Sequence, residues 1–175
     1  FRRPEAVPQR VLAGLFFGAA AVIAMSTPIR FAEGIIVDAR TVVLAVAGLF
    51  TGLPGALAAA LPATAFRIYL GGAGAPIGAL VILIAAGLGS ALFYLRRRDA
   101  RWTSLWALIG SGFAIHIVVL MVEAYLFSGP QGRELVSQLG PELLVAYTAG
   151  FVVISLLFID RERRTLVERE RLELD

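Results

Sequence analysis

The chain has 175 residues, of which 58% are hydrophobic and 17% are charged. Soluble domains are about a quarter charged, so this composition predicts an integral membrane protein. The absence of cysteine excludes disulfides, thiolate metal sites and cysteine nucleophiles. The formal net charge is +3, but the arginines lie beside long apolar runs, where membrane topology explains them, so no nucleic-acid partner is expected.

The first half of the chain contains two uncharged runs that are long enough to cross the hydrocarbon as helices. The first is Val11 to Thr27, in which Gly14 and Gly18 are four residues apart; such spacing permits close helix approach inside the chain, in a homodimer or with a partner subunit. Pro28 to Arg40 has two acids and two arginines and is interpreted as a loop.

The second uncharged run, Thr41 to Phe66, carries "TGLPG" at its middle. Proline removes a backbone donor and glycine weakens a helix, so this run is either one kinked helix or two short ones.

Three further segments complete the membrane part of the chain. Pro76 to Leu95 opens with proline in its first turn, where proline is favoured. Trp102 to Phe127 is the next span, and the polar stretch "SGPQGRELVSQLGPE" is interpreted as a connection to the last span, Leu143 to Ile159. The densely charged residues from Asp160 onward are typical of a helix that leaves the membrane.

Three arginine clusters decide between the two interpretations of the middle run. They are Arg2, Arg3 and Arg10; Arg96, Arg97, Arg98 and Arg101; and Arg161, Arg163 and Arg164. Arginine is enriched on the cytoplasmic side, so successive clusters should be separated by an even number of crossings. A turn at "TGLPG" satisfies this condition and a single helix does not. We therefore predict an all-α membrane bundle of about six segments, two of them short and joined at "TGLPG", with both ends of the chain cytoplasmic.

On this topology Arg40 and Arg67 lie at the two ends of one helical hairpin, on the outer side. A guanidinium offers paired donors that match a carboxylate, and more strongly so in a partly dry pocket. Backbone N–H groups of the adjacent "GGAG" turn and the start of the next helix can add an anion-binding nest. The predicted ligand is a small carboxylate.

The alternative explanation of these arginines is structural. Each can reach a lipid phosphate, or Asp38 and Glu33 can neutralise the pair while "GGAG" serves as a tight turn.

Two ionisable residues lie inside the span from Trp102 to Phe127. His116 and Glu123 are seven residues apart and share a helix face. Because charge is costly at membrane depth, such residues are candidates for ligand binding. Alternatively, His116 packs against another helix and Glu123 lies among the headgroups. A metal site is not expected, because the pair has no third ligand, and no nucleophile with a base or phosphate-binding loop is found, so no catalytic residue is predicted.

The stretch "GIIVDARTVVLAVAGLFTGLPGALAAALPATAFRIYLGGAGAP" resembles the five-transmembrane receptor sensor domain of the LytS/YhcK type (5TMR-LYT). The family pattern has an acid two residues before an arginine, a glycine-rich motif, a second arginine, an aromatic residue and a "GG.G" turn. Where relatives carry further polar residues after this turn, this chain has the apolar "APIGALVILI". The positions that match the family pattern are Asp38, Arg40, Arg67, Tyr69, Gly71, Gly72 and Gly74.

The resemblance implies a bacterial cytoplasmic-membrane sensor that precedes a histidine kinase or a diguanylate cyclase. Its ligand would be a small carboxylate such as pyruvate, bound outside by Arg40 and Arg67. Residues 1–160 would form the sensor domain and residues 161–175 the start of a cytoplasmic signalling helix, through which the receptor dimerises. No cofactor is expected, and this chain by itself is expected not to be an enzyme.

The whole chain is also similar to the substrate-binding subunits of energy-coupling-factor vitamin transporters. The alternative function is therefore a solute-binding transport subunit, although its charged C-terminal stretch favours a receptor. A purely structural anchor is a third alternative.

Overall fold

The computed structural model describes residues 7–27, 29–32, 35–127 and 130–172. Arg2 and Arg3 of the first arginine cluster lie outside this part of the chain. Five helices of the described chain are long and apolar enough to cross a membrane, so the predicted all-α membrane bundle is confirmed. The elements in chain order are α1 (Val7–Ser26), β1 (Ile29–Ala32), β2 (Ile35–Val37), α2 (Arg40–Leu70), α3 (Ala75–Arg98), the short 3₁₀ helix η1 (Ala100–Thr103), α4 (Leu105–Leu126) and α5 (Pro130–Leu172).

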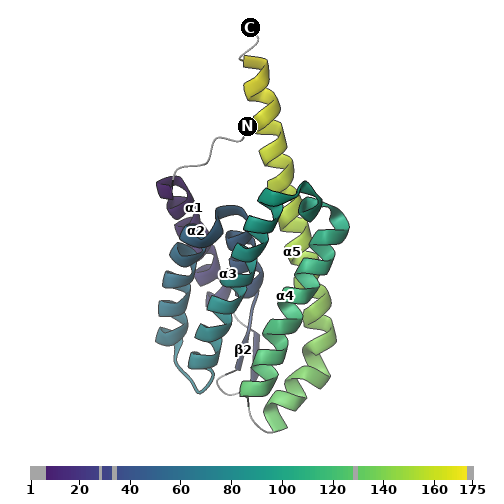
Figure 1. The fold of residues 1–175 in the computed structure, drawn as a ribbon. Helices are drawn as coiled ribbons and strands as arrows, with labels where there is room; N and C mark the ends of the chain where they lie inside the picture. Colours follow the sequence, from purple (N-terminus) through teal and green to yellow (C-terminus); the bar gives the residue numbers. More distant parts are fainter. Residues whose placement is uncertain (1–6, 28, 33–34, 128–129, 173–175) are drawn as a thin grey trace.

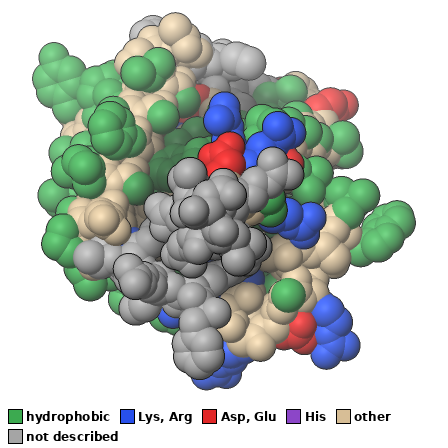
Figure 2. Space-filling model, turned by 90° about the horizontal axis from the view of Figure 1, so that it is seen from above, with side chains coloured by type: hydrophobic (Ala, Val, Ile, Leu, Met, Phe, Trp, Pro, Cys, Tyr) green, Lys and Arg blue, Asp and Glu red, His purple; other side chains and the backbone are tan. Residues whose placement is uncertain are grey.

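The bundle has two distinct ends (Figure 1). At the end that we call the terminal end, α1 begins, α3 ends and α5 leaves the bundle. The opposite end, which we call the loop end, carries the two strands, the turn that joins α2 to α3, the end of α4 and the start of α5. Viewed onto the terminal end, charged side chains lie on this face and hydrophobic side chains occupy its flanks (Figure 2).

Helix α2 reverses direction at Gly52. This residue has φ 61° and ψ −166°, a conformation that glycine adopts without a steric penalty. Arg10 Nε, near the start of α1, donates to Thr51 O at 2.5 Å, so the reversal lies at the terminal end. The two halves of α2 then run side by side (Figure 1). The turn predicted at "TGLPG" is confirmed, and it lies next to arginines as expected.

The first half of α2 is the centre of the bundle. Every residue from 40 to 52 is buried except Val43, which is half-buried. From Arg40 to Thr51 this half has 12 residues and is about 18 Å long, so it is too short to cross the hydrocarbon by itself and depends on the helices that surround it.

Small residues bring the backbones around α2 into close contact. A Cβ on Gly89 of α3 would lie 2.2 Å from Ala45 O, and one on Gly14 of α1 would lie 2.1 Å from Gly55 O. Such close approach is the usual way in which membrane helices gain packing energy. The spacing of Gly14 and Gly18 therefore serves packing inside the chain, since Gly18 also contacts the second half of α2.

Two segments differ from the prediction. The stretch from Pro28 to Arg40, predicted as a loop, contains the antiparallel strands β1 and β2, paired as Ile29↔Val37 and Arg30↔Ile36. Its β-branched isoleucines and valine favour strands. The stretch "SGPQGRELVSQLGPE", predicted as a connection, belongs to α5 from Pro130 onward. Proline is tolerated in the first turn of a helix, and the Glu, Leu and Gln residues that follow favour helix.

Helix α5 has 43 residues and is therefore about 65 Å long, roughly twice the thickness of the hydrocarbon. It extends beyond the bundle at the terminal end (Figure 1), as predicted for the charged segment after Asp160. Both Nη atoms of Arg96 donate to Glu162 of α5, each at 3.1 Å. The guanidinium of Arg96 also lies 4.6 Å from the centre of the Phe50 ring, two residues before the reversal. A bidentate ion pair thus joins α3 and α5 beside the end of the central helix.

We predict that Gly89→Ala destabilises the fold, whereas Gly87→Ala does not. The new methyl group on residue 89 would overlap Ala45 O, and one on residue 87 would meet no atom within 4 Å. Overpacking of this kind costs about 1–3 kcal/mol, and a substitution in open space changes stability by less than about 0.5 kcal/mol. Thermal unfolding of the two purified variants in the same detergent measures the difference. Equal melting temperatures would contradict the close packing of α2 on α3.

Candidate functional site

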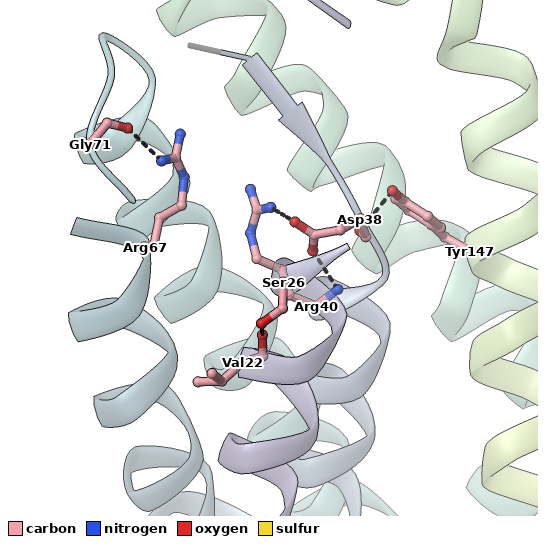
Figure 3. A network of polar contacts seen from close by, with 7 residues as sticks. All are labelled: Val22, Ser26, Asp38, Arg40, Arg67, Gly71 and Tyr147. Carbon is pink, nitrogen blue, oxygen red and sulfur yellow. Dashed lines mark hydrogen bonds and ion pairs between the residues drawn. The ribbon is translucent and has the colours of Figure 1, made fainter. Parts of the chain in front are cut away.

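Arg40 and Arg67 lie together at the loop end. Arg40 is the first residue of α2 and Arg67 is in its last turn, so the reversal at Gly52 brings the two ends of the helix to one place. Both side chains point into the same space between the helices and the strands (Figure 3). They are 3% and 1% exposed, and their charges act on one another. Buried arginines require compensation by acids and hydrogen bonds, which the surrounding residues provide.

Asp38 neutralises Arg40. Its Oδ1 accepts a hydrogen bond from the Arg40 backbone N–H at 2.9 Å, and its Oδ2 forms an ion pair with Arg40 Nη1. The side chain of Asp38 is 2% exposed, so the pair lies away from bulk solvent. The carboxylate also lies at the N-terminus of α2, where the helix dipole stabilises a negative charge.

Tyr147 connects this ion pair to α5. Its hydroxyl donates to the backbone carbonyl of Asp38 at 2.8 Å (Figure 3). The sequence analysis did not select Tyr147. A tyrosine inside an apolar span was the available signal, because a buried tyrosine hydroxyl usually finds a polar partner.

Arg67 is held by the turn between α2 and α3. Its Nη1 donates to Gly71 O at 2.9 Å. Gly78, in the second turn of α3, lies against the side chain, and a Cβ there would be 2.5 Å from Arg67 Nε. Gly78 therefore fixes the position of Arg67, a role that the sequence analysis missed because "APIGAL" has no polar group to suggest it.

The glycine turn differs from the predicted anion nest. The N–H of Gly71 is already bound to Ile68 O, and it is the Gly71 carbonyl that faces the arginine. Gly72 is exposed, with φ 83°, and Gly74 is the capping residue just before α3. The turn thus positions Arg67 through the Gly71 carbonyl, which accepts a hydrogen bond, whereas the predicted nest would have used N–H donors.

Tyr69 does not face the site. It is 83% exposed, and its ring stacks on Phe66 with the centroids 6.1 Å apart. Residues two apart on a helix point in nearly opposite directions, so a buried Arg67 turns Tyr69 outward.

His116 and Glu123 line a pocket between α4 and α5. Its other lining residues are Val119, Leu120, Leu143, Leu144 and Tyr147, and its cavity volume is about 10 Å³, roughly the space for one water molecule. Glu123 interacts electrostatically with Asp38, Arg40 and Arg67, and Tyr147 contributes to both the pocket and the Asp38 contact. The structure therefore brings the predicted ionisable residues into one cluster.

His116 leaves one ring nitrogen available. Its Nδ1 donates to Gly112 O at 2.7 Å, since a carbonyl can only accept. In the neutral ring Nε2 is then an acceptor, and it is buried without a hydrogen-bond partner among the described residues. The ring lies 5.5 Å from that of Tyr147. A ligand or a water molecule in the pocket could donate to Nε2.

The arrangement suits a small anion. Glu123, His116 and the Tyr147 ring line the pocket together with aliphatic side chains, and Asp38, Arg40 and Arg67 act on Glu123 electrostatically. Among the residues that the structure describes there is no group of three side chains able to hold a metal ion.

We predict that Tyr147→Phe lowers the free energy of unfolding by about 1 kcal/mol, because the Asp38 carbonyl loses its hydrogen bond. Tyr125→Phe is the matched control, since Tyr125 is 84% exposed. Chemical unfolding of both variants in mixed micelles gives the comparison. A Tyr147→Phe variant as stable as the control would show that the contact does not contribute.

Comparison with known proteins supports the membrane fold. The family model described as "5TMR of 5TMR-LYT" matches residues 2–161. No curated protein and no solved structure gives a significant match, so the likeness to vitamin-transporter subunits stays a prediction. The family match covers nearly all the bundle, including Arg40, Arg67 and the reversal between them. The chain therefore belongs to the 5TMR-LYT family and is a multi-pass transmembrane sensory domain of the kind found in signalling receptors.

Proposed function

We propose that this domain binds a small carboxylate such as pyruvate at Arg40 and Arg67, and relays binding along α5 to a cytoplasmic histidine kinase or diguanylate cyclase. The domain would act in the bacterial cytoplasmic membrane. It would need no cofactor and would carry out no chemical reaction itself.

The observation that carries the proposal is the pair of buried arginines that meet at the loop end. Arg40 and Arg67 are almost fully buried, yet they come from opposite ends of α2 and converge on one place. Asp38 forms an ion pair with Arg40, so the site already holds one carboxylate on a guanidinium. An anionic ligand would exchange with an acid of the site, since its carboxylate matches the geometry of a guanidinium in the same way.

The pocket favours a small ligand. Its cavity volume is about 10 Å³, roughly the space for one water molecule, so only a small ligand could enter it, and only after the lining side chains shift. Its aliphatic walls suit a short carbon chain, and His116 Nε2 offers an acceptor to a second polar group.

The arginine distribution supports an outward-facing site. Arg10, Arg96, Arg97 and Arg98 lie at the terminal end, which would be cytoplasmic by the positive-inside rule. The loop end with the carboxylate site would then face outward.

Helix α5 favours a receptor over a transport subunit. It extends as a charged helix beyond the bundle at the end from which a cytoplasmic output domain would follow. A solute-binding transport subunit has no use for such an extension. In a receptor, two copies of α5 could pair and transmit a change of helix packing across the membrane.

We predict that pyruvate stabilises the purified domain saturably, and that Arg40→Ala or Arg67→Ala raises the dissociation constant at least about tenfold. A hydrogen bond to a charged group contributes about 1.5–3 kcal/mol, and 1.4 kcal/mol corresponds to a factor of ten. Calorimetric titration in lipid nanodiscs measures the affinity, with lactate and acetate as competing acids.

Arg98→Ala is the matched control, since it removes an exposed arginine at the terminal end. Arg40→Lys and Arg67→Lys keep the charge but lose the forked donor, so they should bind with intermediate affinity. If the alanine and lysine variants of Arg40 and Arg67 all bound pyruvate with the affinity of the unmodified domain, the proposed site would be wrong.

We also predict that Ala73→Cys reacts with a membrane-impermeant maleimide in intact cells, and that Arg98→Cys reacts only after permeabilisation. Both residues are exposed, and the chain has no other cysteine. Labelling at residue 98 from outside, without labelling at residue 73, would invert the proposed orientation.

A further inference from the structure

Asp38 connects the candidate ligand site to the helix that leaves the membrane. Its side chain binds Arg40, and its backbone carbonyl binds the Tyr147 hydroxyl of α5. Asp38 itself lies between β2 and α2, outside any helix or strand. It can therefore change its conformation without breaking a helical hydrogen bond.

Among the described residues, the acids of the site can balance its two arginines without a ligand. Arg40 and Arg67 carry two positive charges, and Asp38 and Glu123 carry two negative charges when ionised. A ligand carboxylate would leave this half-buried cluster with a net negative charge, which is costly in a low-dielectric environment. One of the acids must therefore move away or take up a proton when the ligand binds.

Asp38 is the acid whose position a ligand would need. A guanidinium binds a carboxylate most strongly through parallel N–H donors, and one Nη of Arg40 is already used by Asp38. The end-on edge of the guanidinium presents the two Nη atoms, and Asp38 occupies one of them. A carboxylate that bound across this edge would displace Asp38.

We propose that Asp38 is a built-in competitor for the ligand carboxylate, and that Tyr147 is the positioning residue that transmits its displacement to α5. This inference rests on the proposed binding of a small carboxylate. In the unliganded domain Asp38 occupies Arg40 and its carbonyl holds Tyr147. When the ligand takes Arg40, the Asp38 backbone shifts and the contact with α5 changes.

Helix α5 is suited to respond to such a change. In its most apolar stretch 22% of the residues are buried, against 72% for α2, so the bundle holds it less tightly. In the described part of the chain, two polar contacts tie it to the other helices and the loop: Tyr147 to Asp38 near the loop end, and Glu162 to Arg96 at the terminal end. If the contact between Tyr147 and Asp38 breaks while the contact between Glu162 and Arg96 remains, α5 would tilt about its terminal end.

The test uses spin labels on Arg98→Cys and Val167→Cys, two exposed positions in a chain without native cysteine. Pulsed electron paramagnetic resonance in nanodiscs gives the distance between α3 and the exit helix, with and without pyruvate. We expect Asp38→Asn to give, without ligand, the distance shift that saturating pyruvate gives in the labelled parent. Adding Tyr147→Phe should abolish the shift in both cases.

The matched control is Glu134→Gln, which neutralises an exposed acid in the first turns of α5, outside the cluster. It should leave the distance unchanged. Asp38→Ser is a second neutral variant, so that the result does not depend on the folding of Asp38→Asn. Each variant is also titrated with pyruvate, and neutralising Asp38 should tighten binding by about tenfold.

Two results would overturn the inference. Weaker or unchanged pyruvate binding by both neutral variants would show that Asp38 does not compete with the ligand. A pyruvate-dependent shift that persists in Tyr147→Phe would show that Tyr147 does not transmit it. If the parent failed to bind pyruvate, the proposed function would be contradicted for this acid, and the ligand-free comparison of Asp38→Asn with Glu134→Gln would still decide whether Asp38 controls α5.

Discussion

The reversal of α2 at Gly52 is the constraint on which the rest of the structure depends. A glycine with positive φ lets a buried helix turn back at the terminal end, beside Arg10 and Phe93. The two ends of α2 then meet at the loop end, and with them Arg40 and Arg67. Close backbone contacts through Gly14, Gly55 and Gly89 hold α1 and α3 against the two halves, so the irregular backbone at the turn is covered by protein.

The same helix relates the carboxylate site to the exit helix. Arg40 begins the central half of α2, and Phe50 near its end lies under the guanidinium of Arg96, which binds Glu162 of α5. Helix α5 in turn reaches the site through Tyr147. The loop end, where the site lies, and the terminal end of the bundle are thus joined by the first half of α2 and by α5, with polar contacts at both ends. A shift at one contact can change the balance between two packings, which is how a ligand alters a receptor without moving far itself.

Sequence reasoning succeeded where the signal is local. The glycines and proline of "TGLPG" and the positions of the arginines were enough to predict the turn, and from it the convergence of Arg40 and Arg67. Sequence reasoning failed where a residue's partner is distant in the chain, since Tyr147 binds a backbone carbonyl 109 residues away. It also missed Gly78, which acts by leaving room for the side chain of Arg67. Tyr69 was selected for its place in a motif, but helical geometry turns it away from Arg67. The strands between residues 29 and 37 are too short for their pattern to stand out from a loop.

The central claim is that α2 doubles back, and a single distance tests it most directly. Spin labels on Ala39→Cys and Tyr69→Cys, both exposed positions at the two ends of α2, would be about 45 Å apart in an uninterrupted helix of 30 residues. The reversal at Gly52 predicts less than about half of that separation, with a single narrow distribution in lipid. A distance near the full length of the helix would place Arg40 and Arg67 at opposite membrane surfaces and contradict the shared site.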